Sequence, residues 1–466
     1  MPTTDRQNRL LIAEDWKRIY QSFKNADFKS YDFDNLRRTM VGYLRQNYPE
    51  DFNDYIESSE YLALIDLIAF LGQNIAFRVD LNARENYIEL AERRDSVLRL
   101  ARLLSYNPKR NRAANGFLKI DSVSTTETIY DSNGFNLKDQ TVAWNDPSNE
   151  NWDEQFRKIL NAALPTNNIV GKPITSDTIS GVLTQSYKFN AVNQNVPTYS
   201  FSKSVNGEST KFEVTSCRIV DGNIIEEPPL PGNSLGFLYR EDGQGNSSSN
   251  TGYFVHFRQG QLQTGDFTVS APSANQLISI DSSNINNSDV WLYKLNSIGT
   301  ENALWTKVDS TIGTIVTYNS INKNQRNIFA VQTRQEDKIN LVFADGVFGN
   351  LPKGSFRVYY RQSGNRQYTI RPADISNTVV SINYVSSVGK VETINITLSL
   401  KYNIDNASVS ESNASIRNSA PQTYYTQNRM VTAEDYQIGP LNVSQEIIKA
   451  KTVNRIASGI SRYFDL

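Results

Sequence analysis

The sequence predicts an α+β chain of several domains, with an N-terminal helical bundle segment, a β-rich middle and an α/β C-terminal part. Residues 1–106 contain little Gly or Pro, and their apolar residues recur at helical spacing. After Asn107-Pro108 the apolar period changes from 3.6 to 2, and it returns to helical from Ser412. The expected divisions are a helical assembly segment (1–106), a β-rich domain (107–225), a β-rich insertion or second β domain (226–335), a β domain with an Asp-Gly turn (336–411), and the start of an apparently incomplete C-terminal α/β domain (412–466).

Composition excludes several function classes. Among 466 residues, 48 are Lys or Arg and 49 are Asp or Glu, so the basic excess typical of nucleic-acid binding is missing. One Cys and one His exclude an intramolecular disulfide, a Cys-cluster metal site and any site that needs two histidines. The longest nearly apolar run, Tyr61–Leu71, is too short to span a bilayer, and the polar N-terminus does not resemble a signal peptide. We therefore expect a soluble protein with no cofactor, metal, nucleic-acid or membrane partner.

The N-terminal segment is expected to be an assembly element. Helical spacing begins at Leu10, and Asp34 is a plausible N-cap for a helix through Tyr48, which Pro49 follows. A stronger helix is expected from Ser58 or Ser59, and its first turns are apolar on nearly every face. Such a helix requires burial, and about 106 helical residues offer no other large core. The predicted protein interface on it comprises Leu62, Leu64, Ile65, Ile68, Leu71 and Ile75.

A further amphipathic helix is expected over 87–104, with a solvated face of ion pairs that includes Glu85, Glu89 and Arg93. Alternating strands are expected in the middle of the chain, around 117–123, 141–144, 251–257, 340–343 and 355–360, with a short helix near 153–163. Turns are expected at Asn133-Gly134, Asp221-Gly222, Asp345-Gly346 and Ser363-Gly364-Asn365. Near the C-terminus, Thr432-Ala433-Glu434-Asp435 has the form of a capping box.

Searches for reaction chemistry find no catalytic residue. No phosphate-binding loop, complete dinucleotide motif or nucleophile elbow occurs. His256 lies in an alternating strand pattern, and Cys217 is expected to be a small core or surface residue. The adjacent acids Glu226-Glu227 and Glu336-Asp337 are interpreted as solvated turn acids, because neighbours in a strand point apart. The basic run 109–112 is interpreted as a solvated or protein-facing loop rather than a nucleic-acid contact.

Four segments resemble a known family. They are 34–87, the helix-to-sheet transition at 94–114, the turn motif at 343–354, and 420–436 with its Arg-x-Val-Thr-x-Glu-Asp-Tyr form. In these segments the chain resembles the J-like wedge proteins of contractile-tail baseplates, more narrowly the inner-ring wedge subunit of T4-like phages. The wider family usually has Phe-Gly-Asp-Gly in the turn motif, so Ala344 stands at a position that must tolerate a Cβ atom. Residues 120–335 carry no residue-by-residue match.

The resemblance implies a non-enzymatic structural role in the virion. Two copies of such a subunit and one copy of another wedge protein pair their N-terminal helices into a core bundle. Six wedges form a ring around the tail hub, which holds sheath-initiating and wedge-linking proteins and rearranges on contraction. Asp345, Gly346, Gly349 and Gly354 are expected to be structural, the glycines through positive φ and Asp345 through a turn hydrogen bond.

Two alternatives remain open from the residues. A tail-associated glycan-binding adhesin is suggested by the Ser-, Asn- and Tyr-rich stretches at 192–210 and 243–253. A tail-associated hydrolase would need an acid pair, such as Glu336 and Asp337, to converge in a cleft.

Overall fold

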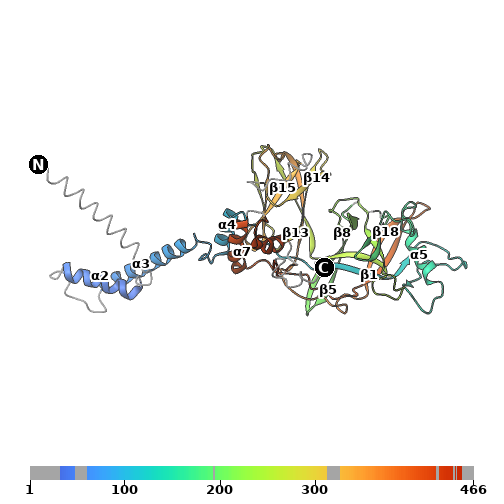
Figure 1. Cartoon of the computed structure of the whole chain (residues 1–466), viewed down its shortest axis with the longest axis horizontal. Coiled ribbons are helices and arrows are strands. Elements are labelled where there is room, and N and C mark those ends of the chain that lie inside the picture. The colour runs from blue at the N-terminus through green and yellow to red at the C-terminus, as the bar shows by residue number, and fades with distance from the viewer. Residues whose placement is uncertain are drawn as a thin grey trace, which may run out of the picture. The chain divides into compact units, whose positions relative to one another are not determined.

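The computed structural model divides the chain into two compact units, residues 1–103 and 104–466 (Figure 1). The residues that it describes are 32–47, 60–190, 192, 195–311, 326–426, 430–443, 447 and 449–453. The helix expected from Leu10 therefore lies outside the described residues.

The N-terminal unit contains α2 (Phe33–Asn47), α3 (Glu60–Arg84) and α4 (Arg94–Leu103). The prediction of Asp34 as N-cap was wrong: Asp32 Oδ1 accepts the backbone N–H of Asn35 at 3.0 Å, and Asp34 lies in the first turn.

The helix predicted over 87–104 is shorter, because its first part is a turn around a buried carboxylate. Glu85 Oε1 accepts the backbone N–H groups of Glu92 and Arg93, both at 3.1 Å, just before α4 begins. Burial raises the pKa of Glu85, but the hydrogen bonds from Ser96, Arg93 and Glu92 outweigh it and lower the pKa overall. Glu85 thus holds the start of α4 instead of forming the expected surface ion pairs.

The first β-domain is built on a ten-stranded sheet, counted over the described residues, with the main order β18-β19-β1-β10-β9-β4-β3. Helix α5 (Trp152–Ala162) packs Phe156, Ile159 and Leu160 into its core. A two-stranded sheet, β7 (Cys217–Val220) and β8 (Asn223–Glu226), accompanies it. The strands are β1 (Asn115–Thr125), β2 (Val142–Ala143), β3 (Thr175–Ile179), β4 (Val182–Lys188), β5 (Tyr199–Val205), β6 (Glu208–Thr215), β9 (Gly236–Glu241), β10 (Gly252–Gln259), β18 (Thr378–Val385) and β19 (Val391–Ser399).

The second β-domain is a seven-stranded, nearly barrel-like sheet in the described part of the chain, ordered β11-β17-β13-β14-β15-β16-β12. Its core is a separate apolar cluster that includes Trp305, Phe343 and Phe356. The strands are β11 (Gln261–Val269), β12 (Leu277–Ile280), β13 (Ile285–Leu295), β14 (Glu301–Val308), β15 (Ile328–Thr333), β16 (Ile339–Phe343) and β17 (Gly354–Gln362).

The chain crosses from the first β-domain into the second at Gly260 and returns after β17. Gly260 alone separates β10 from β11, with φ +110°. The segments predicted as 226–335 and 336–411 therefore each contribute strands to both sheets. Alternation along single strands cannot reveal such a crossing, because it depends on contacts distant in sequence.

The C-terminal part consists, over its described residues, of α7 (Asn413–Thr426) and α8 (Ala433–Val443). The predicted capping box is confirmed: Thr432 Oγ1 accepts the Asp435 N–H at 3.2 Å, and Asp435 Oδ2 accepts the Thr432 N–H at 2.8 Å. The predicted α+β class is confirmed by N-terminal helices, a large β-rich middle and C-terminal helices.

We predict that Gly260→Ala destabilises the protein by about 2 kcal/mol or more, because the positive φ strains any side chain. A Cβ atom there would also lie 2.3 Å from the carbonyl oxygen of Gln362. Gly389→Ala is the matched control, with φ +75° and no atom within 4 Å of its Cβ atom, and should cost about 1 kcal/mol. Urea unfolding of both variants measures the difference, and equal losses would contradict the crowding at Gly260.

Candidate functional site

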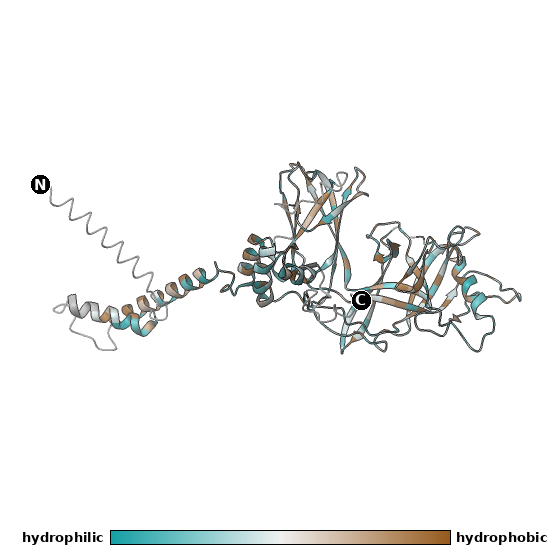
Figure 2. Cartoon of the chain, in the orientation of Figure 1, coloured by the Kyte–Doolittle hydropathy of each residue, from teal (hydrophilic) through white to brown (hydrophobic). Residues whose placement is uncertain are grey.

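Helix α3 is hydrophobic over much of its length (Figure 2), and its apolar residues form two seams. The first seam, Leu62, Ile65, Ala69, Gly72 and Ala76, recurs every 3.5 residues on average. This seam faces α2: Leu62 and Ala69 are buried, and Leu36 Cδ1 of α2 lies 3.2 Å from the position of a Cβ atom on Gly72. Arg37 of α2 also forms an ion pair with Asp66 at 2.7 Å.

The second seam of α3 is exposed. It comprises Leu64, Ile68, Leu71 and Ile75, whose exposed fractions are 51–63%. Leu67, Phe70 and Phe77 extend the exposed apolar surface beside it. Of the six residues predicted as an interface, Leu62 is thus buried within the helical unit and Ile65 is half-buried, while the other four form this seam.

Helix α3 is longer than its most apolar run, and this length bears on whether it could cross a membrane. Residues Leu62–Arg84 are long and apolar enough, by length and composition, to cross a membrane. The nearly apolar run Tyr61–Leu71, which is too short to span a bilayer, is only the first part of this helix. Packing against α2 and the Arg37–Asp66 ion pair favour a protein environment for the helix.

A buried cluster of charges joins the two β-domains. Arg361 on β17 is 1% exposed and forms ion pairs with Glu213 on β6 at 3.1 Å and Glu226 on β8 at 2.9 Å. Its third carboxylate partner, at 3.4 Å, is Asp289 on β13. Arg258 on β10 contacts Glu226 at 2.7 Å and Asp289 at 3.4 Å. Both domains therefore contribute both signs of charge to this Arg361 cluster.

The electrostatics of the Arg361 cluster favour its charged form. Burial alone raises the pKa of Asp289, but Arg258 and Arg361 lower it strongly, and Asn286 and Ser288 donate hydrogen bonds to it. Burial lowers the pKa of Arg361, and the three carboxylates more than offset this. His256 lies nearby with its pKa well below the ordinary value, because of burial and then the two arginines. Thr215 Oγ1 lies 2.6 Å from His256 Nδ1, and His256 is a buried strand residue.

The interpretation of Glu226, Glu227 and Asp337 as solvated turn acids was wrong. Glu226 belongs to the Arg361 cluster, and Glu227 bonds Lys188 at 2.7 Å. Asp337 is buried and accepts the Asn111 N–H at 3.2 Å, whereas Glu336 is exposed and pairs with Lys338. Glu226, Glu227 and Asp337 have partners that lie far away in the sequence: Arg361, Lys188 and the backbone N–H of Asn111, respectively. Their sequence neighbours do not indicate these partners.

The basic run 109–112 faces protein. Arg110 is buried, and its guanidinium donates to the carbonyl oxygens of Ile285 at 3.2 Å and Asn287 at 3.0 Å. Burial lowers its pKa to about 10, against the opposing effect of Asp337 and Asp289. Glu411 accepts the Lys109 N–H at 3.1 Å, so this segment is tied to both the second β-domain and the start of the C-terminal part.

The turn motif at Asp345 forms a rigid loop between β16 and β17. Asp345 Oδ1 accepts the N–H groups of Val347 and Phe348, both at 2.9 Å, and these bonds lower the pKa of Asp345. Gly346 and Gly354 have φ of +88° and +106°. Gly349 is needed for space instead, because its Cβ atom would lie 2.6 Å from that of Ala344 and 2.7 Å from Ile328 Cγ1.

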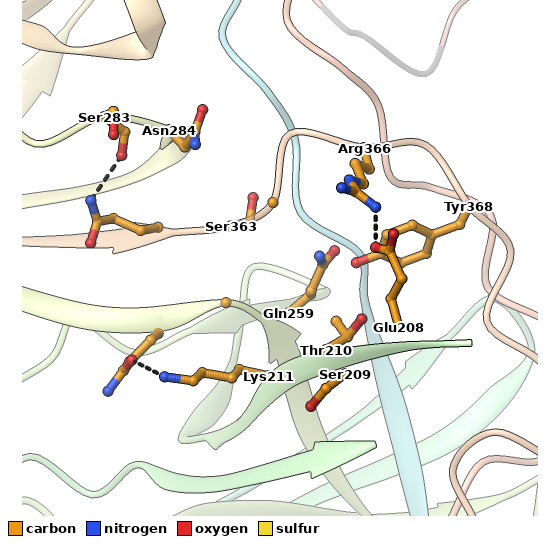
Figure 3. A pocket seen from close by; sticks show the side chains of 14 residues that line it. Glu208, Ser209, Thr210, Lys211, Gln259, Ser283, Asn284, Ser363, Arg366 and Tyr368 are labelled. Atoms are coloured by element: carbon orange, nitrogen blue, oxygen red, sulfur yellow. Dashed lines mark hydrogen bonds and ion pairs between the residues drawn. The ribbon is translucent and has the colours of Figure 1, made fainter. Parts of the chain in front are cut away.

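A polar cleft of about 510 Å³ lies beside the crossing at Gly260, between β6 and the segment 362–368 (Figure 3). Its charged side chains are engaged within the cleft: Glu208 pairs with Arg366, and Lys211 Nζ donates to the amide oxygen Oε1 of Gln261 at 3.1 Å. The remaining side chains that line it are mostly amides and hydroxyls. No nucleophile–base pair exists among these lining residues.

The other sequence candidates do not form a site. Cys217 is buried, and burial raises the pKa of its thiol to about 12. The described residues contain no cluster of His, Cys, Asp or Glu that could hold a metal ion. In the stretch 243–253, polar groups bond locally: Asp242 accepts from Ser248 and Thr251, and Trp144 Nε1 donates to the Asn246 carbonyl at 2.9 Å.

Sequence reasoning missed the Arg361 cluster. The available signal was an arginine within each of two strongly apolar strands, at Phe257-Arg258 and Tyr360-Arg361. A buried strand retains a charge only where a partner lies opposite, but the sequence does not name that partner.

We predict that Arg361→Met lowers the free energy of unfolding by about 3–5 kcal/mol, because the buried Glu213 loses its ion-pair partner and Glu226 and Asp289 keep only Arg258. Arg366→Met is the matched control: it breaks an ion pair whose side chains are about 60% exposed, and the unfolding midpoint should stay unchanged. Chemical unfolding of the full chain measures both. A wild-type midpoint for Arg361→Met would contradict a stabilising role of the cluster.

Comparison with known proteins gives two family matches. Residues 116–403 match a domain of unknown function (DUF8360), and residues 32–103 match the N-terminal domain of bacteriophage baseplate proteins. No curated protein matches the chain. The first match covers more than half of the chain, and the second contains α2, α3 and α4. The chain therefore belongs to the DUF8360 family and, through its N-terminal domain, is a non-enzymatic structural protein of the bacteriophage baseplate, part of the virion.

Proposed function

We propose that the chain is a wedge subunit of the inner baseplate ring in a contractile tail. Two copies pair with another wedge protein through their N-terminal helices, and the wedges close into a ring around the tail hub. The ring holds sheath-initiating and wedge-linking proteins and rearranges when the sheath contracts. The match of residues 32–103 to a baseplate N-terminal domain supports a place in the baseplate. The resemblance of the motifs at 343–354 and 420–436 to wedge proteins supports the wedge subtype.

The observation that carries the proposal is the exposed seam of α3. One seam of this helix already packs on α2, so the second seam needs further helices. Leu64, Ile68, Leu71 and Ile75 follow the 4-3-4 spacing with which coiled-coil helices pack. Burying a half-exposed Leu or Ile side chain is worth roughly 1 kcal/mol, so two or three copies of the seam provide a substantial driving force.

The Arg361 cluster supports a subunit whose two β-domains move together as one rigid body. Breaking it would leave buried charges unpaired, so the two β-domains resist rotation against each other. Rearrangement of the ring then occurs between rigid bodies rather than within this β-rich body.

We predict that Leu64→Asp or Ile68→Asp abolishes wedge assembly and leaves the β-rich body folded. Both side chains are exposed in the single chain, so the charge is tolerated there but would be buried without a partner in a bundle. The measurement is light-scattering mass of the full chain co-expressed with the other baseplate proteins of the same phage. Wild type should give a complex with two copies of the chain.

The matched control is Val388→Asp, which puts the same charge on an exposed valine in the turn between β18 and β19. This variant should assemble like wild type, and thermal unfolding should show a folded body for all three variants. If Leu64→Asp and Ile68→Asp still form the complex at wild-type concentration, the helix-bundle role is wrong.

A further inference from the structure

The polar cleft beside Gly260 is lined by both β-domains (Figure 3). Residues 208–211 of β6 line it from the first β-domain, and Asn284 and the end of β17 line it from the second. The Gly260 N–H donates to the Lys211 carbonyl oxygen at 2.9 Å, and the Ser363 N–H donates to that of Asn284 at 3.2 Å. The backbone around the cleft is therefore fixed, and its volume of about 510 Å³ lies in the range of small-molecule sites.

Gln259 presents an unused amide group to this cleft. The residue is only 4% exposed, and its Oε1 accepts the backbone N–H of Ala114 at 3.2 Å. That bond fixes the side chain and leaves the Nε2 group, which donates no hydrogen bond to any residue that the structure describes. Burying an amide N–H group without a partner costs free energy, so a ligand that accepts from Gln259 would gain affinity.

Other amides that line the cleft are also only partly used. Gln362 Nε2 donates to the Ser283 carbonyl oxygen at 2.8 Å, which leaves Gln362 Oε1 as an acceptor. Gln261 Oε1 accepts from Lys211, which leaves Gln261 Nε2 as a donor. The side-chain amide of Asn284 forms no hydrogen bond within the described parts of the chain. The cleft thus offers donors and acceptors side by side.

The remaining lining residues limit the kind of ligand. Glu208 is the one carboxylate among them and is paired with Arg366, which does not suit a metal ion. Lys211 is engaged by Gln261, so neither basic side chain is left to attract an anion. Tyr368 is the one aromatic residue of the lining, and it packs against the core of the first β-domain. A single ring is too little for an apolar ligand or for the anchors of a peptide.

We propose that this cleft binds a short, uncharged saccharide. A sugar hydroxyl both donates and accepts hydrogen bonds, so neighbouring hydroxyls can accept from Gln259 and donate to Gln362. The ring of Tyr368 provides a surface for the C–H face of a sugar ring. The Ser- and Asn-rich stretch 192–210 contributes residues 208–210 to this site. The site adds a ligand to the structural role and does not depend on the wedge proposal.

The test is saturation-transfer NMR on the purified full chain. The probes are neutral di- and trisaccharides of glucose, galactose, mannose, rhamnose and N-acetylglucosamine. An acidic disaccharide of the same size and a Ser-Asn-Ser peptide are the comparison ligands. We expect transfer to at least one neutral saccharide, and little to the acidic disaccharide or the peptide. The Kd of the best saccharide is then measured by titration.

Asn284→Gly should raise that Kd about 5-fold, because it removes one amide from the cleft. The backbone at Asn284 has φ +55°, which glycine adopts without strain. Asn275→Gly is the matched control, since Asn275 has φ +54° and does not line the cleft. This control should bind like wild type, and both variants should have the same unfolding temperature.

Gln259→Glu should raise the Kd about 10-fold or more, because it keeps an oxygen for Ala114 and removes both Nε2 donors. If this variant does not fold, Asn284→Gly decides alone. The proposal is wrong if no neutral saccharide binds, if only the acidic disaccharide or the peptide binds, or if Asn284→Gly and every folded Gln259→Glu sample bind like wild type. None of these results bears on wedge assembly, which is measured separately by complex formation.

Discussion

Arg361 lies between the two β-domains, and its guanidinium nitrogens contact carboxylates on three different strands. A guanidinium directs its N–H groups in fixed directions within one plane, so these contacts define orientation as well as distance. The chain crosses between the domains at Gly260, where φ is +110°. Without the Arg361 cluster, this crossing would be a natural place for a hinge. With it, the β-rich middle of the chain is one stiff piece.

Other parts of the chain carry exposed apolar side chains on well-ordered elements. Helix α3 has one apolar seam packed on α2 and another left open. The loop between β16 and β17 has a backbone held by hydrogen bonds to Asp345 and Arg326. Apolar groups on rigid supports are suited to contacts that must keep their geometry in a large assembly.

Local patterns predicted much of this fold, and long-range contacts account for the rest. The capping box at Thr432 and the strand 117–123 follow from a few neighbouring residues, and both were found. The crossing at Gly260 and the partners of Glu226 depend on strands far apart in sequence, so alternation could not predict them. Gly349 shows the same limit: its glycine was expected for a positive φ, but it is needed because Ala344 and Ile328 lie too close.

The single cysteine of the chain has a practical consequence. Cys217 is buried and its thiol has a raised pKa of about 12, so maleimides and spin labels would react with it very slowly. A cysteine introduced on an exposed site, such as Ile298 or Val388, would then be the one reactive thiol without removal of the native residue. Paired reporters on the two β-domains could follow their separation in an assembled particle. Distance measurements with introduced cysteines would therefore contain little signal from the native cysteine.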